Sequence, residues 1–292
     1  MIRRLAVIGV GLIGGSLARA LRAAHGVEEV VGCARSQTNL DKAMELGVID
    51  RGTLNAGAAV TGADMVFLAV PLGAMRGTFE AIRGRLADDA VITDAGSAKA
   101  SVVADCAAAF GTPPAGFVPG HPIAGTEHSG VEASFATLYR DRRVILTPGR
   151  DTDPAATART EAMWRLCGAE VSYMSVAHHD EVLAATSHLP HMLAFGLVDM
   201  LAAMKDNNEV FRYAAGGFRD FTRIASSNPE MWRDICIANQ DALVTMLERF
   251  SSEMVALAEV IRRGDGERLL AIFQRAKKAR DHYVSGIPNR PE

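Results

Sequence analysis

Short apolar runs alternate with helix-like stretches along the first 176 residues of the chain. The apolar runs cover residues 5–8, 30–33, 65–70, 90–93, 117–118 and 144–146, and helical spacing fills stretches such as 74–86 and 99–110. This alternation predicts a mostly parallel, doubly wound α/β sheet of the Rossmann type. A helix over 154–166 and a strand over 170–174 are expected to close this domain.

From residue 177 onward the strand pattern disappears and apolar positions recur at helical spacing. The helical pattern covers residues 182–204, 231–250, 254–263 and 267–284. We therefore predict an N-terminal α/β domain over 1–176 and an all-α C-terminal domain over 177–292. The helices carry many apolar residues for so few elements, so we expect some faces to be buried against a second copy in a homodimer.

A glycine-rich turn follows the first apolar run. Gly9, Gly11 and Gly14 form the pattern G-x-G-x-x-G, with Leu12 and Ile13 inside it, between a predicted strand and a predicted helix. The first glycine permits a tight turn, the second lets a pyrophosphate approach the backbone, and the third allows close helix packing. We therefore predict a dinucleotide site, with a merely structural turn as the alternative.

The end of the second predicted strand bears on the choice of coenzyme. An NAD enzyme usually has an acidic residue there, which binds the adenosine ribose. This chain has Ala34, followed by Arg35 and Ser36. A missing carboxylate with an added guanidinium and hydroxyl suits a 2′-phosphate, so we expect NADP to be preferred, with NAD possible. An ordinary surface arginine is the alternative.

Two more strand ends carry candidate ligand contacts, because open α/β sheets bind ligands at the carboxyl ends of their strands. Val70 and Pro71 follow one predicted strand, and Ser97 lies in the turn after the next. Ser97 could cap the helix that begins near Lys99, or belong to the site, or do both.

His121 lies between Gly120 and Pro122, in a predicted loop that also holds Thr126 and Glu127. We expect this loop to act on a molecule held beside the nucleotide. A histidine used only for packing is the alternative.

The helical half contains polar residues that packing alone does not require. Asp180, His188 and His191 can lie near one face of a helix, because eight- and three-residue spacings give similar angles. A metal site is disfavoured, since no third ligand has a recognisable spacing and Pro190 disturbs the turn. Further on, the charged stretch 219–223 could be a solvated cluster or part of a site.

Composition narrows the class of protein. The chain has 292 residues, 49% of them hydrophobic, and a formal net charge of -3, which gives no general basis for binding nucleic acid or an anionic membrane. No apolar stretch reaches the roughly 18 residues of a membrane helix. Four dispersed cysteines indicate a reducing, cytoplasmic location.

Three motifs together carry a family resemblance. GHPIAGTEHSG, SHLPH and FRDFTRIASSNPEMW follow the glycine turn in this order. The chain thereby resembles the prephenate/arogenate (cyclohexadienyl) dehydrogenase family of tyrosine biosynthesis. The resemblance implies a nucleotide domain, a helical dimerisation domain and an active site between them. It also implies oxidative decarboxylation of prephenate or arogenate to 4-hydroxyphenylpyruvate or tyrosine, with hydride transfer to NAD(P). Ala34 and Arg35 depart from the NAD-using relatives.

The resemblance also implies roles at the reacting centre. His121 resembles the histidine that hydrogen-bonds the substrate hydroxyl, and Ser97 the serine between that histidine and the nicotinamide. Arg223 resembles the arginine that binds the ring carboxylate. A different dehydrogenase acting on a hydroxy acid, or a non-catalytic NAD(P)-binding redox sensor, remains an alternative, although a sensor would not need these three residues together.

Further positions match the family's pocket. His191 resembles a histidine near the substrate side chain, and Thr126 and Glu127 match residues that shape the pocket. Asp220 and Trp232 match positions associated with the entrance to the site.

Overall fold

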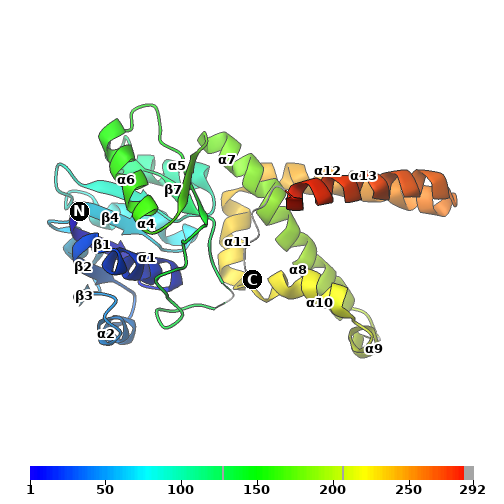
Figure 1. Ribbon diagram of the computed structural model, residues 1–292, viewed down its shortest axis with the longest axis horizontal. Coiled ribbons are helices and arrows are strands. Elements are labelled where there is room, and N and C mark those ends of the chain that lie inside the picture. The colour runs from blue at the N-terminus through cyan, green and yellow to red at the C-terminus, as the bar shows by residue number, and fades with distance from the viewer. Residues whose placement is uncertain (127, 206, 286–292) are drawn as a thin grey trace. The chain divides into compact units, whose positions relative to one another are not determined.

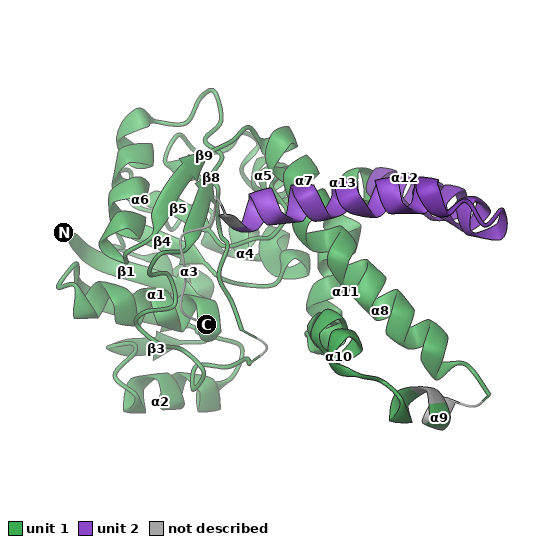
Figure 2. Cartoon of the chain, turned by 45° about the vertical axis from the view of Figure 1, so that its right-hand side comes forward, with its two compact units in different colours: residues 1–243 green, residues 244–292 purple. Residues whose placement is uncertain are grey.

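The structure is a computed structural model, and it describes residues 1–126, 128–205 and 207–285. The chain divides into two compact units, residues 1–243 and residues 244–292 (Figure 2).

A six-stranded parallel sheet lies in the N-terminal part of the first unit (Figure 1). Its strands, in chain order, are β1 Ile2–Ile8, β2 Val27–Cys33, β3 Arg51–Thr53, β4 Met65–Leu68, β5 Val91–Asp94 and β6 Phe117–Val118. The order across the sheet is β3-β2-β1-β4-β5-β6, so the direction of winding reverses between β1 and β4. A reversal of this kind is where doubly wound sheets bind ligands, at the carboxyl ends of the strands. The predicted Rossmann-type sheet is confirmed.

Helices cover both faces of this sheet. One apolar cluster contains α1 Leu12–Ala23, α2 Gln37–Glu45 and α6 Pro154–Leu166, and the other contains α3 Ala56–Val60, α4 Met75–Ile82 and α5 Lys99–Phe110. Within β1, Leu5 and Val7 join the first cluster, whereas Ala6 and Ile8 join the second. Alternate side chains of a strand point to opposite faces, and both faces are buried here, which explains the continuous apolar runs.

A second, three-stranded sheet corrects one prediction. It consists of β7 Gly120–Pro122, β8 Arg143–Leu146 and β9 Glu170–Tyr173, with β7 antiparallel and β9 parallel to β8. The apolar runs at 144–146 and 170–174 were expected to extend the main sheet, and that expectation is wrong. The chain leaves the main sheet at Pro119, which lacks the N–H needed to continue a ladder. His121 accordingly lies on β7 and not in a loop.

From α7 onward the described chain is mostly helical, as predicted, but two long helices are interrupted. The predicted helix 182–204 consists of the end of α7 Val176–Leu183, a π-helical turn Ala184–His188 and α8 Leu189–Ala202. Pro190 in the first turn of α8 cannot donate to a preceding carbonyl, and the wider π turn accommodates this loss. The predicted helix 231–250 breaks at Asn239.

The remaining helices follow α8 in chain order. They are α9 Asn207–Arg212, α10 Gly216–Thr222, the 3₁₀ turn η3 Arg223–Ser226, α11 Pro229–Ala238, α12 Gln240–Arg262 and α13 Gly266–Ser285. The predicted segment 254–263 is the end of α12 and not a separate helix. Across the described residues, no helix combines the length and the apolar character needed to span a membrane.

Candidate active site

The glycine turn between β1 and α1 has the shape of a pyrophosphate cradle. A Cβ atom on Gly9 would lie 2.3 Å from the carbonyl oxygen of Ala69, and one on Gly14 would lie 2.2 Å from that of Gly9, so neither position tolerates a side chain. A Cβ on Gly11 would meet no described atom within 4 Å. Gly11 is the N-cap residue of α1 and offers no side chain to cap the helix, so the helix begins beside this open space. Such a helix start binds anions.

Two hydrogen bonds hold the backbone of this turn. The hydroxyl of Tyr139 donates to the carbonyl of Ile13 at 2.6 Å, and the amide of Asn39 donates to the carbonyl of Val10 at 3.1 Å. Burial raises the pKa of Tyr139 well above its ordinary value, so the phenol stays a donor. Leu12 packs into the core beside them. The turn is therefore held in shape from two sides.

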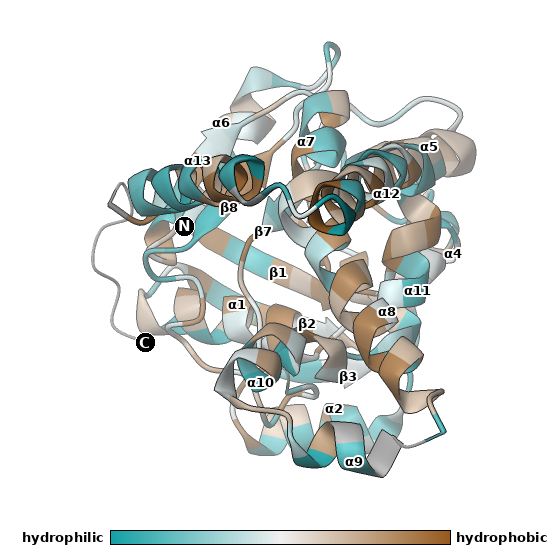
Figure 3. Cartoon of the chain, turned by 90° about the vertical axis from the view of Figure 1, so that its right-hand side faces the viewer, coloured by the Kyte–Doolittle hydropathy of each residue, from teal (hydrophilic) through white to brown (hydrophobic). Residues whose placement is uncertain are grey.

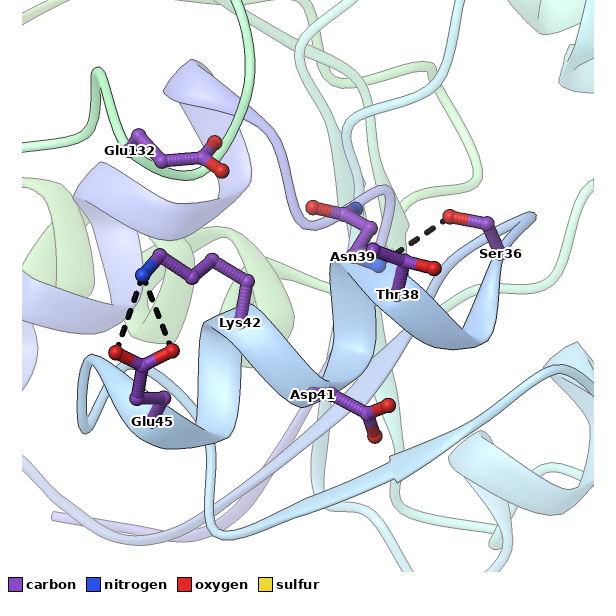
Figure 4. A pocket seen from close by; sticks show the side chains of 7 residues that line it. All are labelled: Ser36, Thr38, Asn39, Asp41, Lys42, Glu45 and Glu132. Atoms are coloured by element: carbon purple, nitrogen blue, oxygen red, sulfur yellow. Dashed lines mark hydrogen bonds and ion pairs between the residues drawn. The ribbon is translucent and has the colours of Figure 1, made fainter.

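A cavity of about 490 Å³ lies where β2 ends and α2 begins (Figure 4). Its walls are formed by Ser36, Thr38, Asn39, Asp41, Lys42, Glu45 and Glu132. Ser36 caps α2 by accepting from the N–H of Asn39 at 3.3 Å, and Lys42 lies 3.0 Å from a carboxylate oxygen of Glu45. Arg35 is exposed at the same strand end. Rossmann sheets bind the adenosine ribose at this edge.

The residues that follow β4 and β5 differ in how deeply they are buried. After β4, Val70 is half-buried and Pro71 is exposed. After β5, Asp94 and Lys99 form an ion pair whose two side chains are fully buried. Burial lowers the pKa of Lys99, and the Asp94 charge opposes this effect.

The Asp94–Lys99 pair fixes the backbone that precedes His121. Lys99 Nζ donates to the carbonyl oxygen of Gly120 at 2.7 Å, and Asp94 Oδ1 accepts from the N–H of Gly120 at 3.1 Å. The other oxygen of Asp94 accepts from the N–H of Gly96 at 2.7 Å. A buried charge pair thus connects the turn that holds Ser97 with the strand that holds His121.

Ser97 does not cap α5, so the capping alternative is wrong. The cap position is Ala98, whose methyl group offers no acceptor. Asp180 on α7 takes this role, because its two oxygens accept from the N–H groups of Lys99 and Ala100, each at 2.8 Å. Ser97 is half-buried beside this contact, and its hydroxyl is not used as the cap.

His121 stands at the start of a buried hydrogen-bonded chain. Its Nδ1 lies 2.9 Å from Nε2 of His179, and Nδ1 of His179 lies 2.7 Å from Oδ1 of Asp180. Burial lowers the pKa of His121 well below its ordinary value, and the neighbouring His179, Lys99 and His188 lower it further. His121 is therefore a neutral imidazole at neutral pH.

Asp180, His188 and His191 are linked through two residues of α11 and its C-cap: Asn239 contacts Asp180 and His188, and the Trp232 ring contacts both His188 and His191. The amide of Asn239 donates to the carbonyl of Asp180 at 2.9 Å and lies 3.1 Å from Nδ1 of His188. His191 lies 2.8 Å from a backbone carbonyl and stacks on Trp232 with ring centroids 3.7 Å apart. Burial lowers the pKa of His188 to about 4 and also lowers that of His191.

The other predicted substrate residues lie at the surface. Arg223 is exposed in η3, which packs against α8. Burial of His191 is the main cause of its lowered pKa, and the charge of Arg223 lowers that pKa further. Asp220 and Thr126 are exposed, and the Thr126 hydroxyl accepts from the backbone N–H two residues later at 3.2 Å. Glu127 lies outside the described residues. The structure thus brings Arg223 near His191. Among the described residues, the side-chain hydrogen bond of His121 goes to His179 and not to Thr126 or Asp220.

Sequence reasoning missed three residues of the site. Lys99 reads as a surface helix residue and Asn239 as a mid-helix residue, and His179 is one of two adjacent histidines in AHHDE. The sequence offered a signal only for His179, because a histidine next to Asp180 in the chain can donate a hydrogen bond to its carboxylate. In the described part of the chain, no three His, Cys, Asp or Glu side chains are placed to bind a metal ion.

A glycine turn at the carboxyl end of β1, with a buried neutral histidine held next to the end of β5, fits a nicotinamide-dependent dehydrogenase. Comparison with known sequences narrows this class. The prephenate dehydrogenase nucleotide-binding domain matches residues 17–173, and the prephenate dehydrogenase dimerization domain matches residues 175–275. The chain belongs to the prephenate dehydrogenase family, and the resemblance found in the sequence is confirmed.

Individual relatives match over nearly the whole chain. The cyclohexadienyl dehydrogenase of Zymomonas mobilis is 40% identical over 280 residues, which are 95% of this chain and 95% of the relative. The prephenate dehydrogenase of Bacillus subtilis is 36% identical, over 97% of this chain and 75% of the relative.

Solved structures agree with these relatives. Prephenate dehydrogenase from A. aeolicus, in complex with hydroxyphenyl propionate and NAD+, has a TM-score of 0.90 at 38% identity and covers 97% of this chain and 99% of its own. Synechocystis arogenate dehydrogenase has a TM-score of 0.81 at 30% identity and covers 96% of this chain and 99% of its own.

Proposed function

We propose that this protein catalyses the oxidative decarboxylation of prephenate, arogenate or both, with hydride transfer to NAD(P), in tyrosine biosynthesis. The observation that carries the proposal is His121, a buried neutral histidine on β7. Asp94 and Lys99 hold its neighbour Gly120 at the carboxyl end of β5, the sheet edge at which the glycine turn follows β1. A redox sensor would need the cradle but not a buried acceptor of this kind. Family membership supports the same reaction.

The residues fit the chemistry of a cyclohexadienol. A bound nicotinamide supplies the hydride acceptor. As the ring carbon that bears the hydroxyl loses hydride, the hydroxyl proton becomes acidic and a neutral imidazole such as His121 accepts it. Ser97, held in the turn that Asp94 connects to Gly120, would orient the hydroxyl and the imidazole. Loss of the ring carboxylate as carbon dioxide makes the ring aromatic and drives the reaction.

We assign substrate binding to the surface around α8. Arg223 would pair with the ring carboxylate, and the stacked rings of His191 and Trp232 would form a wall beside the substrate side chain. Thr126 and Asp220 would line the entrance. Substrate would thus meet a charged, exposed region before it reaches His121.

We infer that NADP is the preferred coenzyme. The adenosine edge has no acid at Ala34, and Arg35 and Ser36 provide donors for a 2′-phosphate. Glu45 and Glu132 in the adjoining cavity oppose an anion there, and Lys42 pairs with Glu45. The preference therefore depends on Arg35.

We also propose a homodimer through the helical part of the chain, with the domain boundary at 176/177. The match to a dimerization domain supports this, and so do exposed apolar side chains in the second unit, among them Val255, Leu270 and Phe273, which are 69%, 57% and 56% exposed. Figure 3 shows apolar colouring along much of α8 as well. The four cysteines form no disulfide among the described residues, which supports a reducing, cytoplasmic location.

The decisive experiment measures reduced-coenzyme absorbance with prephenate and arogenate, each with NAD and NADP, and identifies the products by mass. Formation of 4-hydroxyphenylpyruvate or tyrosine together with carbon dioxide is the expected result. Turnover of a panel of hydroxy acids but of neither cyclohexadienol would favour the other dehydrogenase class. Coenzyme binding without any turnover would favour a sensor.

A further inference from the structure

The direction of the hydrogen bonds around His121 follows from Asp180. Both oxygens of this carboxylate accept from backbone N–H groups, of Lys99 and of Ala100, so the group is ionised and can only accept. Burial alone would raise the pKa of Asp180, but the hydrogen bonds from His179 and the two backbone groups hold it below its ordinary value. His179 must therefore donate its Nδ1 proton to Asp180.

This donation fixes both histidine tautomers. When His179 carries a single ring proton, that proton lies on Nδ1 and Nε2 has a lone pair. The atom 2.9 Å from that lone pair is Nδ1 of His121, which must therefore carry a proton and donate it. The remaining nitrogen of His121, Nε2, is left with a lone pair and can accept a proton.

We propose that His179 and Asp180 are positioning residues that keep His121 in the tautomer able to accept a proton, and that His179 takes up the proton that His121 passes on. The proposal rests on the proposed function of His121. In this step the substrate O–H bond breaks and a bond forms between its proton and His121 Nε2. The Nδ1–H bond of His121 breaks as His179 Nε2 gains that proton. Asp180 then holds an imidazolium, and the proton returns through His121 to solvent after product leaves.

The charges around the two rings favour this relocation. Asp180 contacts His179 directly, whereas the buried cation Lys99 is among the groups that lower the pKa of His121, after burial and His179. Asp94 and the Gly120 carbonyl engage that cation, and His188 stays neutral with a pKa of about 4. A positive charge is therefore more stable on the ring beside the carboxylate than on the ring beside the ammonium.

The arrangement is built into the fold and does not await a ligand. His179 is fully buried, and Asp180 sits at the first turn of α5, where the helix dipole also favours a negative charge. Asn239, the C-cap residue of α11, holds the backbone of Asp180. Three helices thus set the position of one carboxylate.

Two substitutions separate relay from packing. His179→Gln keeps a donor and an acceptor but cannot take a proton, and Asp180→Asn removes the charge that sets the tautomer. We expect Asp180→Asn to lower kcat by roughly 10²–10⁴-fold, since the wrong tautomer removes the base. We expect His179→Gln to lower kcat by about tenfold or more, a part of the same contribution. KM should change little in both variants.

The pH profile distinguishes the relay from a structural role. In the wild type, His121 and His179 share a proton that is stabilised beside Asp180. Because His179→Gln removes that stabilised position, His121 should be protonated less readily and the acid limb of kcat should move to lower pH. His178→Gln is the matched control, because the adjacent histidine is 61% exposed, and it should change neither kcat nor the limb. An unchanged kcat and limb in His179→Gln would overturn the relay, even if its thermal stability falls.

Nitrogen-15 NMR of the histidine rings gives a readout that needs no substrate. The resonance assigned to His121 by its loss in His121→Asn should show a protonated Nδ1 and a bare Nε2. A proton on Nε2 would overturn the proposal. If the expected tautomer is found but neither prephenate nor arogenate is turned over, the proposed function fails and the positioning stands. If Asp180→Asn does not fold, His179→Gln and the wild-type spectrum still decide the matter.

Discussion

The candidate site has two regions that differ in how far folding alone completes them. The inner cluster consists of Asp94, Lys99, His121, His179 and Asp180. The outer rim consists of Arg35, Thr126, Asp220 and Arg223. Every member of the inner cluster is buried and hydrogen-bonded, whereas every member of the outer rim is exposed. The fold alone therefore fixes the position of His121 and its supporting residues. The exposed side chains of the outer rim would find their main partners in bound ligands. Inner substitutions should change turnover or stability, and outer ones should change affinity.

The largest expected effect is that of His121→Asn. Loss of the proton acceptor should lower kcat by roughly 10²–10⁴-fold, while coenzyme affinity and the thermal midpoint stay near those of the wild type. Stopped-flow turnover, coenzyme titration and thermal unfolding on one preparation test this. Nearly normal turnover in the variant would remove His121 from the mechanism.

The wild-type pH profile adds a second test of His121. Because burial lowers its pKa well below the ordinary value of about 6.5, the neutral acceptor persists as pH falls through that value. The acid limb of kcat/KM should therefore lie below about pH 6.5. A limb at or above that pH would show that His121 is protonated more easily than its burial implies.

Lys99→Met tests the inner cluster through stability. Removing one member of a buried ion pair leaves the other charge unpaired, which costs about 3–5 kcal/mol in the free energy of unfolding. Lys42→Met is the matched control, because its pair with Glu45 is exposed and should be worth about 0–1 kcal/mol. Denaturant titration measures both, and equal losses would contradict the distinction.

Arg223→Ala tests the outer rim. A charged hydrogen bond to the substrate is worth about 1.5–3 kcal/mol, so KM for substrate should rise by roughly 10- to 100-fold with little change in coenzyme affinity. Arg219→Ala, an exposed neighbour on α10, serves as the control and should change KM much less. Equal losses for substrate and coenzyme would point to a structural role for Arg223.

The smallest expected effect concerns the coenzyme. Ala34→Asp combined with Arg35→Ile should shift the ratio of kcat/KM between NADP and NAD by about tenfold toward NAD, since an acid binds the ribose hydroxyl and repels a phosphate. Steady-state kinetics with both coenzymes measure the ratio. A wild-type protein that already uses NAD more efficiently would disprove the NADP preference.

Local signals made the main sheet and the glycine turn predictable. The apolar runs of β1 and β2 and the spacing of Gly9, Gly11 and Gly14 are written in adjacent residues. The three-stranded sheet was not predictable, because β7 is only three residues long and contains a glycine and a proline. Three residues are too few to show the alternation of apolar and polar positions that identifies a strand.

Most contacts of the inner cluster could not be predicted from the sequence, because they join residues that are far apart in the chain. The partners His121 and His179 are 58 residues apart, and Asp180 caps a helix 81 residues before it. A lysine in a sequence is expected at the surface, and Lys99 is buried only because Asp94 and the Gly120 carbonyl meet it in the fold. The motifs located His121, but its supporting contacts are tertiary.

The cap that Asp180 provides for α5 has a consequence for how relatives of this protein can exchange parts. The two matched family domains meet between residues 173 and 175, so His121 and Lys99 fall in one and His179 and Asp180 in the other. A crossover at that junction would inherit a proton acceptor from one parent and its support from another. Chimeras joined there should keep activity only where the two parents supply residues that make the same contacts between His121 and His179 and between α5 and Asp180. The domain junction is therefore a poor place for recombination between distant relatives.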